Sequence, residues 1–506
     1  MIIMKKHLVK LAITSLASLT IIGCAPEFDN PVDASSNFSK GNADFSKYVA
    51  VGDSLTAGYA DGALYKMGQQ NSYPNILAQQ FKQVGGGAFK QPLMNDNLGG
   101  LLFGGSANPE FGKRLVFNPQ TQAPEEIAGT STTEVYANGP LTGPFNNMGV
   151  PGAKSYHLAS ATYGNPAGLA TDPATANPYY VRIASSTGAT VIGDAAAQAP
   201  TFFTLWIGNN DVLNYATAGG VGTDQTGNLD LTSYSRVDIT DPTVFAGAYS
   251  GYVDALTAAG GKGVLINIPD VSSIPFFTTV PYNAVPLDAA TAETLNTAYA
   301  AYNGGLDAAL AAGVPGLTAD EVAKRKIQFS AGQNAVVIMD EGLTDLTGVN
   351  SALVNMRQAT ADDLIVLTAS SKIGTLADAA DPNSAWGVGK PLEDGDVLIP
   401  SEIEAINRAR TAYNVTIKAL ADGNDNLVLA DIDALLNEIN TTGFNYGTGT
   451  VFATYVTGNT FSLDGVHPTA RGYAIVANTI MAAIEKQFGA SLPRVDPNNY
   501  TAVFFK

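Results

Sequence analysis

Short apolar runs with the character of buried strands alternate along this chain with segments of helical pattern. The clearest runs cover residues 48–51, 201–207, 264–268 and 426–430. Helical pattern is strongest over 72–81, where Ser72 is a candidate cap and Pro74 an early helical residue, and over 472–488. Strands separated by helices favour a mostly parallel sheet with helices on both faces. We therefore expect an α/β fold.

Polar and glycine-rich motifs follow several of these runs. Gly52-Asp53-Ser54-Leu55 follows the first run, and Gly208-Asn209-Asn210-Asp211 follows the run at 201–207. A glycine block, Asn147 to Gly152, follows Phe145. Taken singly each motif is weak, because glycine turns and Asn-Asp pairs are common in loops. Ligands of parallel sheets bind at the carboxyl ends of strands, which is where these motifs are expected to meet.

A carboxylate and an imidazole lie three positions apart near the carboxyl terminus, at Asp464 and His467. A serine hydroxyl becomes nucleophilic when a neighbouring base takes its proton and a third group orients that base. Histidine is the natural base near neutral pH. The chain has three histidines, and His7 lies in a predicted leader, which leaves His157 and His467. We read His157 as a loop or helix residue, with a substrate contact as the alternative.

Taken in order, these four motifs resemble the SGNH or GDSL family of esterases and lipases. The resemblance implies a three-layer α/β/α sandwich of SGNH/flavodoxin-like type. It implies that Ser54 is the nucleophile, His467 the general base and Asp464 its orienting carboxylate. The GxSxG elbow of α/β-hydrolases occurs nowhere in the sequence, which agrees with this family.

The resemblance also implies an oxyanion hole. Its donors would be the backbone N–H groups of Ser54 and Gly152 and the side-chain amide of Asn210. Gly149 is the alternative to Gly152 in the glycine block. In the family, the residues that correspond to Asp53 and Asp211 have mainly structural roles, and we expect the same here. Asp270 follows another strand-like run, and we expect it to lie in a turn.

The family motifs cover only short parts of a hydrolase domain predicted over 46–490, and two long insertions interrupt it. Residues 85–145 are rich in Gly, Pro and Asn and include the apolar group 101–103. This segment is either a lid or acyl-binding wall, or a surface loop. The second insertion, 271–400, contains a helix-like run and strand-like runs at 335–339 and 364–367. Residues 491–506 are expected to form a tail.

The amino terminus has the pattern of a secretion signal. A basic start precedes an apolar stretch, 11–22, that is too short to span a bilayer, and Ile21-Ile22-Gly23-Cys24 ends it. These last four residues resemble a bacterial lipobox, which implies a leader over 1–24 and a lipidated Cys24. An ordinary signal peptide is the alternative. Residues 25–45 would form a flexible tether. The predicted location is the bacterial cell envelope, anchored by lipid, in the outer membrane.

The charge and the composition of the chain argue against several kinds of partner and binding site. The formal net charge of −18 repels phosphate backbones, so we expect no nucleic-acid partner. Cys24 is the only cysteine, and the histidines are few, so we expect no transition-metal site, although calcium held by loop aspartates stays open. The predicted chemistry needs no cofactor.

The predicted function is hydrolysis of carboxylic esters through an acyl-serine intermediate. The partners would be an acyl ester, from a lipid or an acylated glycan, and the membrane that holds the anchor. Glycan O-deacetylation, phospholipase and thioesterase activity remain alternatives, since the pocket alone decides among them. A non-enzymatic surface binding protein on the same scaffold is the remaining alternative, and it would require a broken triad.

Overall fold

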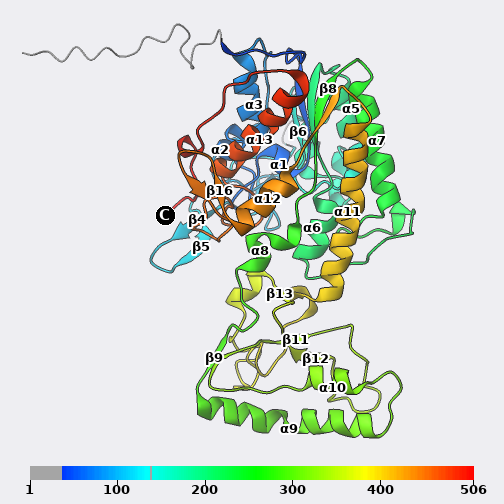
Figure 1. Ribbon diagram of the computed structural model, residues 1–506, viewed down its shortest axis with the longest axis vertical. Coiled ribbons are helices and arrows are strands. Elements are labelled where there is room, and N and C mark those ends of the chain that lie inside the picture. The colour runs from blue at the N-terminus through cyan, green and yellow to red at the C-terminus, as the bar shows by residue number, and fades with distance from the viewer. Residues whose placement is uncertain (1–36, 137–138) are drawn as a thin grey trace, which may run out of the picture.

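The computed structural model describes residues 37–136 and 139–506 (Figure 1). The predicted leader, Cys24 and most of the predicted tether lie outside these residues. The chain forms a mixed α/β structure around a five-stranded, all-parallel sheet. Its strands, in the order in which they lie in the sheet, are β15 (Leu427–Ala430), β8 (Lys262–Ile266), β7 (Phe202–Trp206), β1 (Tyr48–Gly52) and β6 (Asn147–Gly149).

The strand order places β1 between β6 and β7. The chain therefore builds outward from β1 first on one side and then on the other, and such a reversal creates a crevice at the carboxyl ends of the central strands. Gly52 at the end of β1 pairs in register with Gly149 of β6 and with Trp206 of β7. The loops that follow these three strands consequently begin side by side at the carboxyl edge of the sheet.

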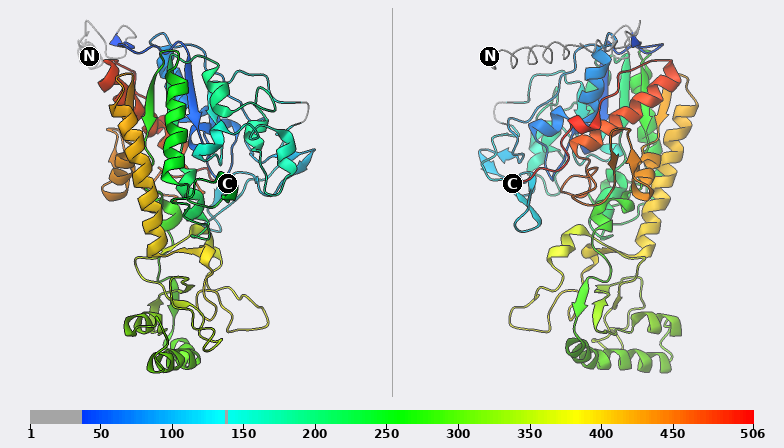
Figure 2. Two further views of the ribbon diagram at one scale, coloured as in Figure 1. Left: turned by 90° about the vertical axis from the view of Figure 1, so that its right-hand side faces the viewer. Right: turned by 60° about the vertical axis from the view of Figure 1, so that its left-hand side comes forward.

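Helices cover both faces of the sheet, because side chains alternate along each strand and both sets are apolar. On one face, Tyr48, Phe202 and Val264 pack with α3 (Tyr73–Lys82) and α13 (Ala470–Phe488). On the other face, Val49 and Phe203 join a larger core. The helices that contribute to it include α5 (Val191–Ala196), α6 (Asn210–Thr217), α7 (Pro242–Thr257) and α11 (Pro400–Asp422), as Figure 2 shows from two sides.

The four predicted strands are confirmed, each with ends shifted by at most two residues. Strand β6 was not predicted, and its three residues lie within the glycine block. The helix predicted at 72–81 is α3, and Ser72 is its N-cap residue. However, the Ser72 hydroxyl donates to Gln69 O at 2.8 Å and does not cap the helix. Among the described residues, no helix is both long enough and apolar enough to cross a bilayer.

The first insertion, 85–145, contains two small antiparallel pairs. They are β2 (Leu102–Phe103) with β3 (Ser106–Ala107), and β4 (Leu115–Asn118) with β5 (Ala123–Glu126). The predicted tail, 491–506, packs against this segment, since Phe117 N donates to Phe504 O at 2.8 Å and Lys506 N to Phe117 O at 3.0 Å. The predicted tail is thereby part of the packed structure and holds the β4–β5 pair.

The second insertion forms a separate lobe at one end of the molecule (Figures 1 and 2). It begins after α8 (Pro275–Thr278) and ends at α11. Its elements are α9 (Ala289–Ala311), α10 (Ala319–Arg325), β9 (Val285–Leu287) paired with β10 (Gly332–Asn334), β11 (Val337–Met339) paired with β12 (Met356–Gln358), and β13 (Leu364–Ile365) paired with β14 (Val397–Leu398). Inside the lobe, the buried Arg357 guanidinium pairs with Asp340 at 2.5 Å and Asp363 at 2.6 Å. The lobe thus has an interior of its own.

Candidate active site

The turn between β1 and a short helix, α1 (Ser54–Ala57), presents Ser54 at the carboxyl edge of the sheet. Asp53 caps α1, since its Oδ1 accepts from Leu55 N at 3.0 Å, and its Oδ2 accepts from Asn209 Nδ2 at 2.9 Å. Burial raises the pKa of Asp53 to about 6, against the lowering effect of these hydrogen bonds. Asp53 therefore ties the turn that carries Ser54 to the loop after β7.

The three residues predicted as a triad form one hydrogen-bonded chain. Ser54 Oγ lies 2.8 Å from His467 Nε2, and His467 Nδ1 lies 2.9 Å from Asp464 Oδ2. The consistent assignment has Nδ1–H donating to the carboxylate, which leaves Nε2 free to accept the serine proton. This arrangement can remove the proton from Ser54 as its oxygen attacks an electrophile.

Asp464 is held as a carboxylate by its surroundings. Its Oδ1 accepts from the backbone N–H of Val466 at 2.9 Å and of His467 at 2.8 Å, and from Ser462 Oγ at 3.0 Å. Burial by itself would raise the pKa of Asp464, but the neighbouring His467 and the hydrogen bonds from His467 and Val466 lower it to about 2. Asp464 is therefore ionised at neutral pH and can stabilise a protonated His467.

A turn early in the chain clamps the loop that carries Asp464. Asp61 N donates to Ser462 Oγ at 2.8 Å, and Asp61 Oδ1 accepts from Leu463 N at 3.1 Å. Gly62 N donates to Asp464 Oδ2 at 3.0 Å. Asp61 has φ of +54°, a left-handed conformation that Asp adopts more readily than most residues. Neither Asp61 nor Gly62 belongs to a motif recognised in the sequence.

Tyr59 packs against the His467 imidazole, with ring centroids 4.7 Å apart. Its hydroxyl donates to Gly62 O at 2.6 Å, and its carbonyl accepts from Tyr473 Oη at 2.7 Å. Both ends of Tyr59 are thereby fixed. The ring covers part of the imidazole and limits the orientations that His467 can adopt.

The glycine block lies beside the Ser54 turn, since Val150 N donates to Gly52 O at 2.9 Å. The two candidate glycines differ in environment. A Cβ at Gly149 would lie 2.3 Å from Ala57 N, so Gly149 permits close packing of β6 on α1. Gly152 has φ of +79°, and a Cβ there would meet only Asn177 Nδ2, at 3.9 Å. Among the described residues, the N–H groups of Ser54 and Gly152 donate to no protein acceptor. Both donors are thus available to a ligand.

Asn210 is buried at the start of α6, and its Nδ2 donates to Ala153 O at 2.9 Å. An amide nitrogen carries two hydrogens, so one donor remains. The contact links Asn210 to the residue after Gly152. Next to it, the buried Asp211 accepts from Ser155 N at 2.7 Å and from Ser155 Oγ at 2.6 Å, which fixes the glycine loop to α6.

The two other residues considered in the sequence occupy structural positions. His157 lies in the 3-10 helix η2 (Ser155–Ala159), where its Nδ1 accepts from Lys154 N at 3.1 Å and its ring stacks on Tyr163. Burial, with a smaller effect of Lys154, lowers the pKa of His157 to about 3, so the imidazole is neutral. Asp270 caps the 3-10 helix η5 (Val271–Ser273) by accepting from Ser272 N at 3.0 Å. His157 thus lies in a short helix and Asp270 at a turn, which are the positions expected from the sequence.

An apolar pocket of about 80 Å³ opens beside Ser54 and His467. Most of its walls are aliphatic and come from α12 (Ile432–Thr441), from α13 and from the segment around η5. Among the described residues, none of those that line it belongs to 85–145. Leu101 is instead buried in the main core. Residues 101–103 are therefore not part of this pocket, whose apolar lining includes Leu435, Leu436, Ile439, Phe461, Ile475 and Val476.

The second insertion contacts the loop that carries Asp464 and His467 near the points where it joins the main body. Phe276 N, in α8, donates to Gly465 O at 2.9 Å. A Cβ at Gly465, where φ is +72°, would lie 3.0 Å from Leu367 and 3.1 Å from Phe276 N. The long insertion therefore supports this loop from outside, a role that the sequence did not indicate.

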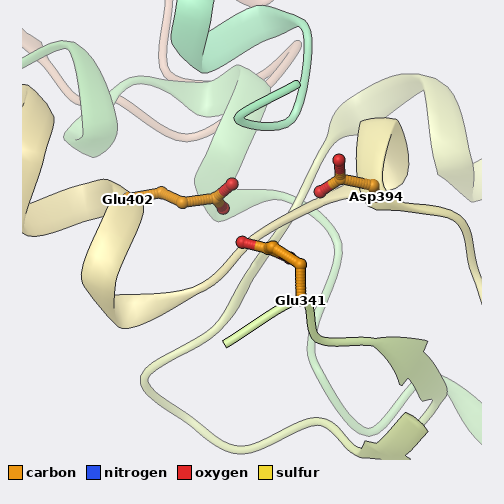
Figure 3. A group of neighbouring side chains, drawn as sticks. All are labelled: Glu341, Asp394 and Glu402. Carbon is orange, nitrogen blue, oxygen red and sulfur yellow. The ribbon is translucent and has the colours of Figure 1, made fainter. Parts of the chain in front are cut away.

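A cluster of three carboxylates lies where the lobe meets the main body (Figure 3). Glu341, Asp394 and Glu402 bring carboxylate oxygens within 4.8 Å of one another. Burial, together with the charges of Glu341 and Asp394, raises the pKa of Glu402 to about 8. Burial and the charge of Glu341 raise the pKa of Asp394 to about 6. Because the three residues are far apart in sequence, no motif pointed to them.

Comparisons of the chain with protein-family models, with curated proteins and with solved structures find no match.

Proposed function

We propose that this protein is a serine hydrolase that cleaves carboxylic esters through an acyl-serine intermediate. The observation that carries the proposal is the continuous chain of hydrogen bonds from Ser54 through His467 to Asp464, beside an apolar pocket. A serine paired in this way with an oriented histidine is an activated nucleophile.

In the proposed reaction, Ser54 Oγ attacks the ester carbonyl while His467 Nε2 accepts the serine proton. His467 then gives that proton to the departing alcohol, and the acyl group remains on Ser54. A water molecule, deprotonated by His467, attacks the acyl-serine and releases the acid. Asp464 holds the imidazole and stabilises its charged form in both steps. The chemistry requires no cofactor.

The negative oxygen that develops in each step would be bound by Ser54 N–H, Gly152 N–H and the Asn210 amide. The two backbone donors have no acceptor among the described residues, and the amide keeps one hydrogen. Losing one such donor typically costs roughly 2.7–4 kcal/mol of transition-state stabilisation.

The pocket favours an acyl group longer than acetyl. An acetyl ester would place a single methyl group at the entrance and leave most of the aliphatic wall without contact. Each further methylene buried there would contribute about 0.8 kcal/mol. We therefore place lipid-like acyl esters ahead of glycan O-acetyl groups as substrates.

The finer fold assignment and the location belong to the same proposal. The all-parallel sheet, the helices on both its faces and three of the four motifs at strand ends support an SGNH-type three-layer sandwich. The sequence pattern at 21–24 supports a lipid anchor at Cys24 in a bacterial envelope, in the outer membrane.

The test is hydrolysis of 4-nitrophenyl acyl esters of increasing chain length by the purified protein and by Ser54→Ala. Exposed Ser351 in the lobe provides a matched control, Ser351→Ala. We expect activity to disappear in Ser54→Ala only, with an optimum above two carbons. Equal rates in wild type and Ser54→Ala would refute the proposal, and an optimum at acetate would favour a deacetylase. If a fluorophosphonate probe does not label the wild-type protein, that result would indicate a non-enzymatic binding protein.

A further inference from the structure

A buried lysine follows the loop that carries Gly152. Lys154 is 0% exposed, and its Nζ donates to a backbone carbonyl, Asp238 O, at 2.5 Å. Burial lowers the pKa of Lys154 to about 8, against the raising effects of the Asp211 and Asp238 charges, so the side chain is charged at neutral pH. Burying an ammonium group costs free energy that its contacts must offset. Lys154 therefore has a more specific role than filling space.

The carbonyl that accepts from Lys154 belongs to a well-held residue. Asp238 is 3% exposed and lies between α6 and α7. Its carboxylate accepts from Thr223 N at 3.0 Å, Gln225 Nε2 at 2.6 Å, Ser235 N at 2.8 Å and Ser235 Oγ at 2.5 Å. These bonds fold the connection between the two helices around Asp238. The ammonium group of Lys154 is consequently attached to a fixed part of the structure.

The peptide group between Ala153 and Lys154 is joined to two of the three proposed oxyanion donors. Ala153 directly follows Gly152, and Ala153 O accepts from Asn210 Nδ2 at 2.9 Å. The N–H of the same peptide group donates to His157 Nδ1 at 3.1 Å. A displacement of Lys154 would therefore shift Gly152 N–H and the Asn210 amide together.

We propose that Lys154 is a positioning residue for the oxyanion hole, since its bond to Asp238 O holds the segment after Gly152 and thereby keeps Gly152 N–H and the Asn210 amide in place. This inference rests on the proposed ester hydrolysis and adds a residue that acts without touching the substrate. The negative oxygen develops only in the transition state, so a displaced hole should slow the reaction more than it weakens substrate binding.

Lys154→Met tests this role in the full chain, because it removes the ammonium group and keeps a side chain of similar length. We expect kcat for 4-nitrophenyl hexanoate to fall by about tenfold or more, with KM changed by less than about threefold. The Ki of an alkyl trifluoromethyl ketone, whose adduct with Ser54 carries the negative oxygen, should rise in parallel with the loss of kcat. Lys154→Arg keeps a charged donor, so its kcat should lie between those of Lys154→Met and wild type.

Lys262→Met is the matched control. Lys262 Nζ also donates to a backbone carbonyl, Asn42 O at 2.7 Å, but Lys262 begins β8 and lies at the opposite edge of the sheet from Ser54. This variant should keep the wild-type kcat and the wild-type Ki of the ketone.

A double-mutant cycle with Asn210→Ala shows whether Lys154 acts through the hole. Replacing Lys154 in an Asn210→Ala protein should lower kcat by a clearly smaller factor than in wild type, because one of the donors that it positions is already gone. Equal factors in the two backgrounds would mean that Lys154 acts independently of Asn210, and would contradict the inference.

The remaining outcomes separate this inference from the function beneath it. A wild-type kcat in folded Lys154→Met would overturn the inference and leave ester hydrolysis standing. If Lys154→Met does not fold, Lys154→Arg decides: a lowered kcat at unchanged KM supports positioning, whereas wild-type kinetics would show that Lys154 only compensates the charge of buried Asp211. Absence of hydrolysis and of fluorophosphonate labelling in the wild-type protein would remove the proposed function itself.

Discussion

Gly62 N–H donates at 3.0 Å to Asp464 Oδ2, the same oxygen that accepts from His467 Nδ1 at 2.9 Å. The carboxylate is therefore oriented from two sides, by its own loop and by a turn near the start of the fold. Asp61 completes this clamp by binding both Ser462 and Leu463. The clamp acts on the imidazole through Asp464, so Asp61 is a positioning residue.

Replacement of Asp61 tests the clamp. Asp61→Ala removes the oxygen that accepts from Leu463 N. It also places alanine in a left-handed conformation, at φ of +54°, without a polar side chain to stabilise it. We expect kcat for a 4-nitrophenyl ester to fall by about tenfold or more, because a poorly oriented base raises the barrier, with KM changed much less. Asp61→Asn keeps an acceptor and tolerates this conformation, and should recover most of kcat. Equal losses in both variants, or a loss confined to KM, would contradict a positioning role.

Removal of the Asn210 amide tests the oxyanion hole. Asn210→Ala should lower kcat by 10²–10³ if the amide stabilises the developing charge. The variant also leaves Ala153 O without its donor, so thermal unfolding must be measured alongside. Asn214→Ala, on the exposed side of the same helix, is the control and should keep its kcat. A kcat within threefold of wild type in a folded Asn210→Ala protein would exclude the amide from the hole.

The depth of the pocket should set the preferred acyl length. Leu435→Phe places a larger side chain on the α12 wall and narrows the pocket, so kcat/KM should fall more for esters of long acyl groups than for esters of short ones. We expect the kcat/KM ratio of octanoate to acetate to fall at least tenfold. Leu435→Met, which nearly conserves volume, should keep the wild-type ratio. An unchanged ratio in Leu435→Phe would mean that the acyl chain binds elsewhere.

The carboxylate cluster predicts a dependence of stability on pH. The folded-state pKa of Glu402, about 8, is above the ordinary value of 4.5, so between these values the folded protein keeps a proton that the unfolded chain has lost. The free energy of unfolding should therefore decrease as pH rises through this window. Glu402→Gln removes the effect and should be more stable than wild type at pH 8, by on the order of 2 kcal/mol, and similar to it at pH 4.

The control for this effect is Glu404→Gln, an exposed residue on the same helix. Its unfolding free energy should follow that of wild type at every pH. Denaturant unfolding at pH 4, 6 and 8 measures all three proteins. A constant difference between Glu402→Gln and wild type across this range would show that the carboxyl does not titrate as described.

The lipid anchor is tested by metabolic labelling with a fatty acid in a bacterium that processes lipoproteins. Wild-type protein should take up label and sediment with membranes. Cys24→Ala should do neither, because Cys24 is the only thiol in the chain. Label in Cys24→Ala would disprove the lipobox assignment.

The sequence pointed to the proposed triad because Ser54 follows a recognisable apolar run and because histidine is rare in this chain. Ser54 ends a strand-like run, and His467 is one of three histidines. The parallel sheet then brings the strand ends together, so spacing along the chain predicted proximity in space. The same reasoning missed β6, whose residues Asn147–Gly149 have neither the length nor the composition of a typical strand.

What the sequence could not show depends on contacts between distant segments. The clamp from Asp61 consists of hydrogen bonds from backbone N–H groups to side-chain oxygens, and its partners stand about 400 positions apart in the sequence, so no local motif marks it. The pocket walls on α12 and α13 read as ordinary amphipathic helices, since a side chain that lines a pocket and one that fills a core have the same composition. The apolar group at 101–103 looked like an acyl wall for that reason, yet Leu101 fills the core.

The lobe leaves and rejoins the main body at adjacent points. Val280, where the chain enters the lobe, pairs with Ile365, and Ile365 pairs in turn with Val397, where the chain leaves the lobe for α11. Closing a loop costs free energy that grows only slowly with its length, so an insert with neighbouring ends imposes little on its host. Residues 281–396, between these two ends, are in this sense a replaceable insert, and a short linker or a foreign domain could replace them without altering the register of the sheet.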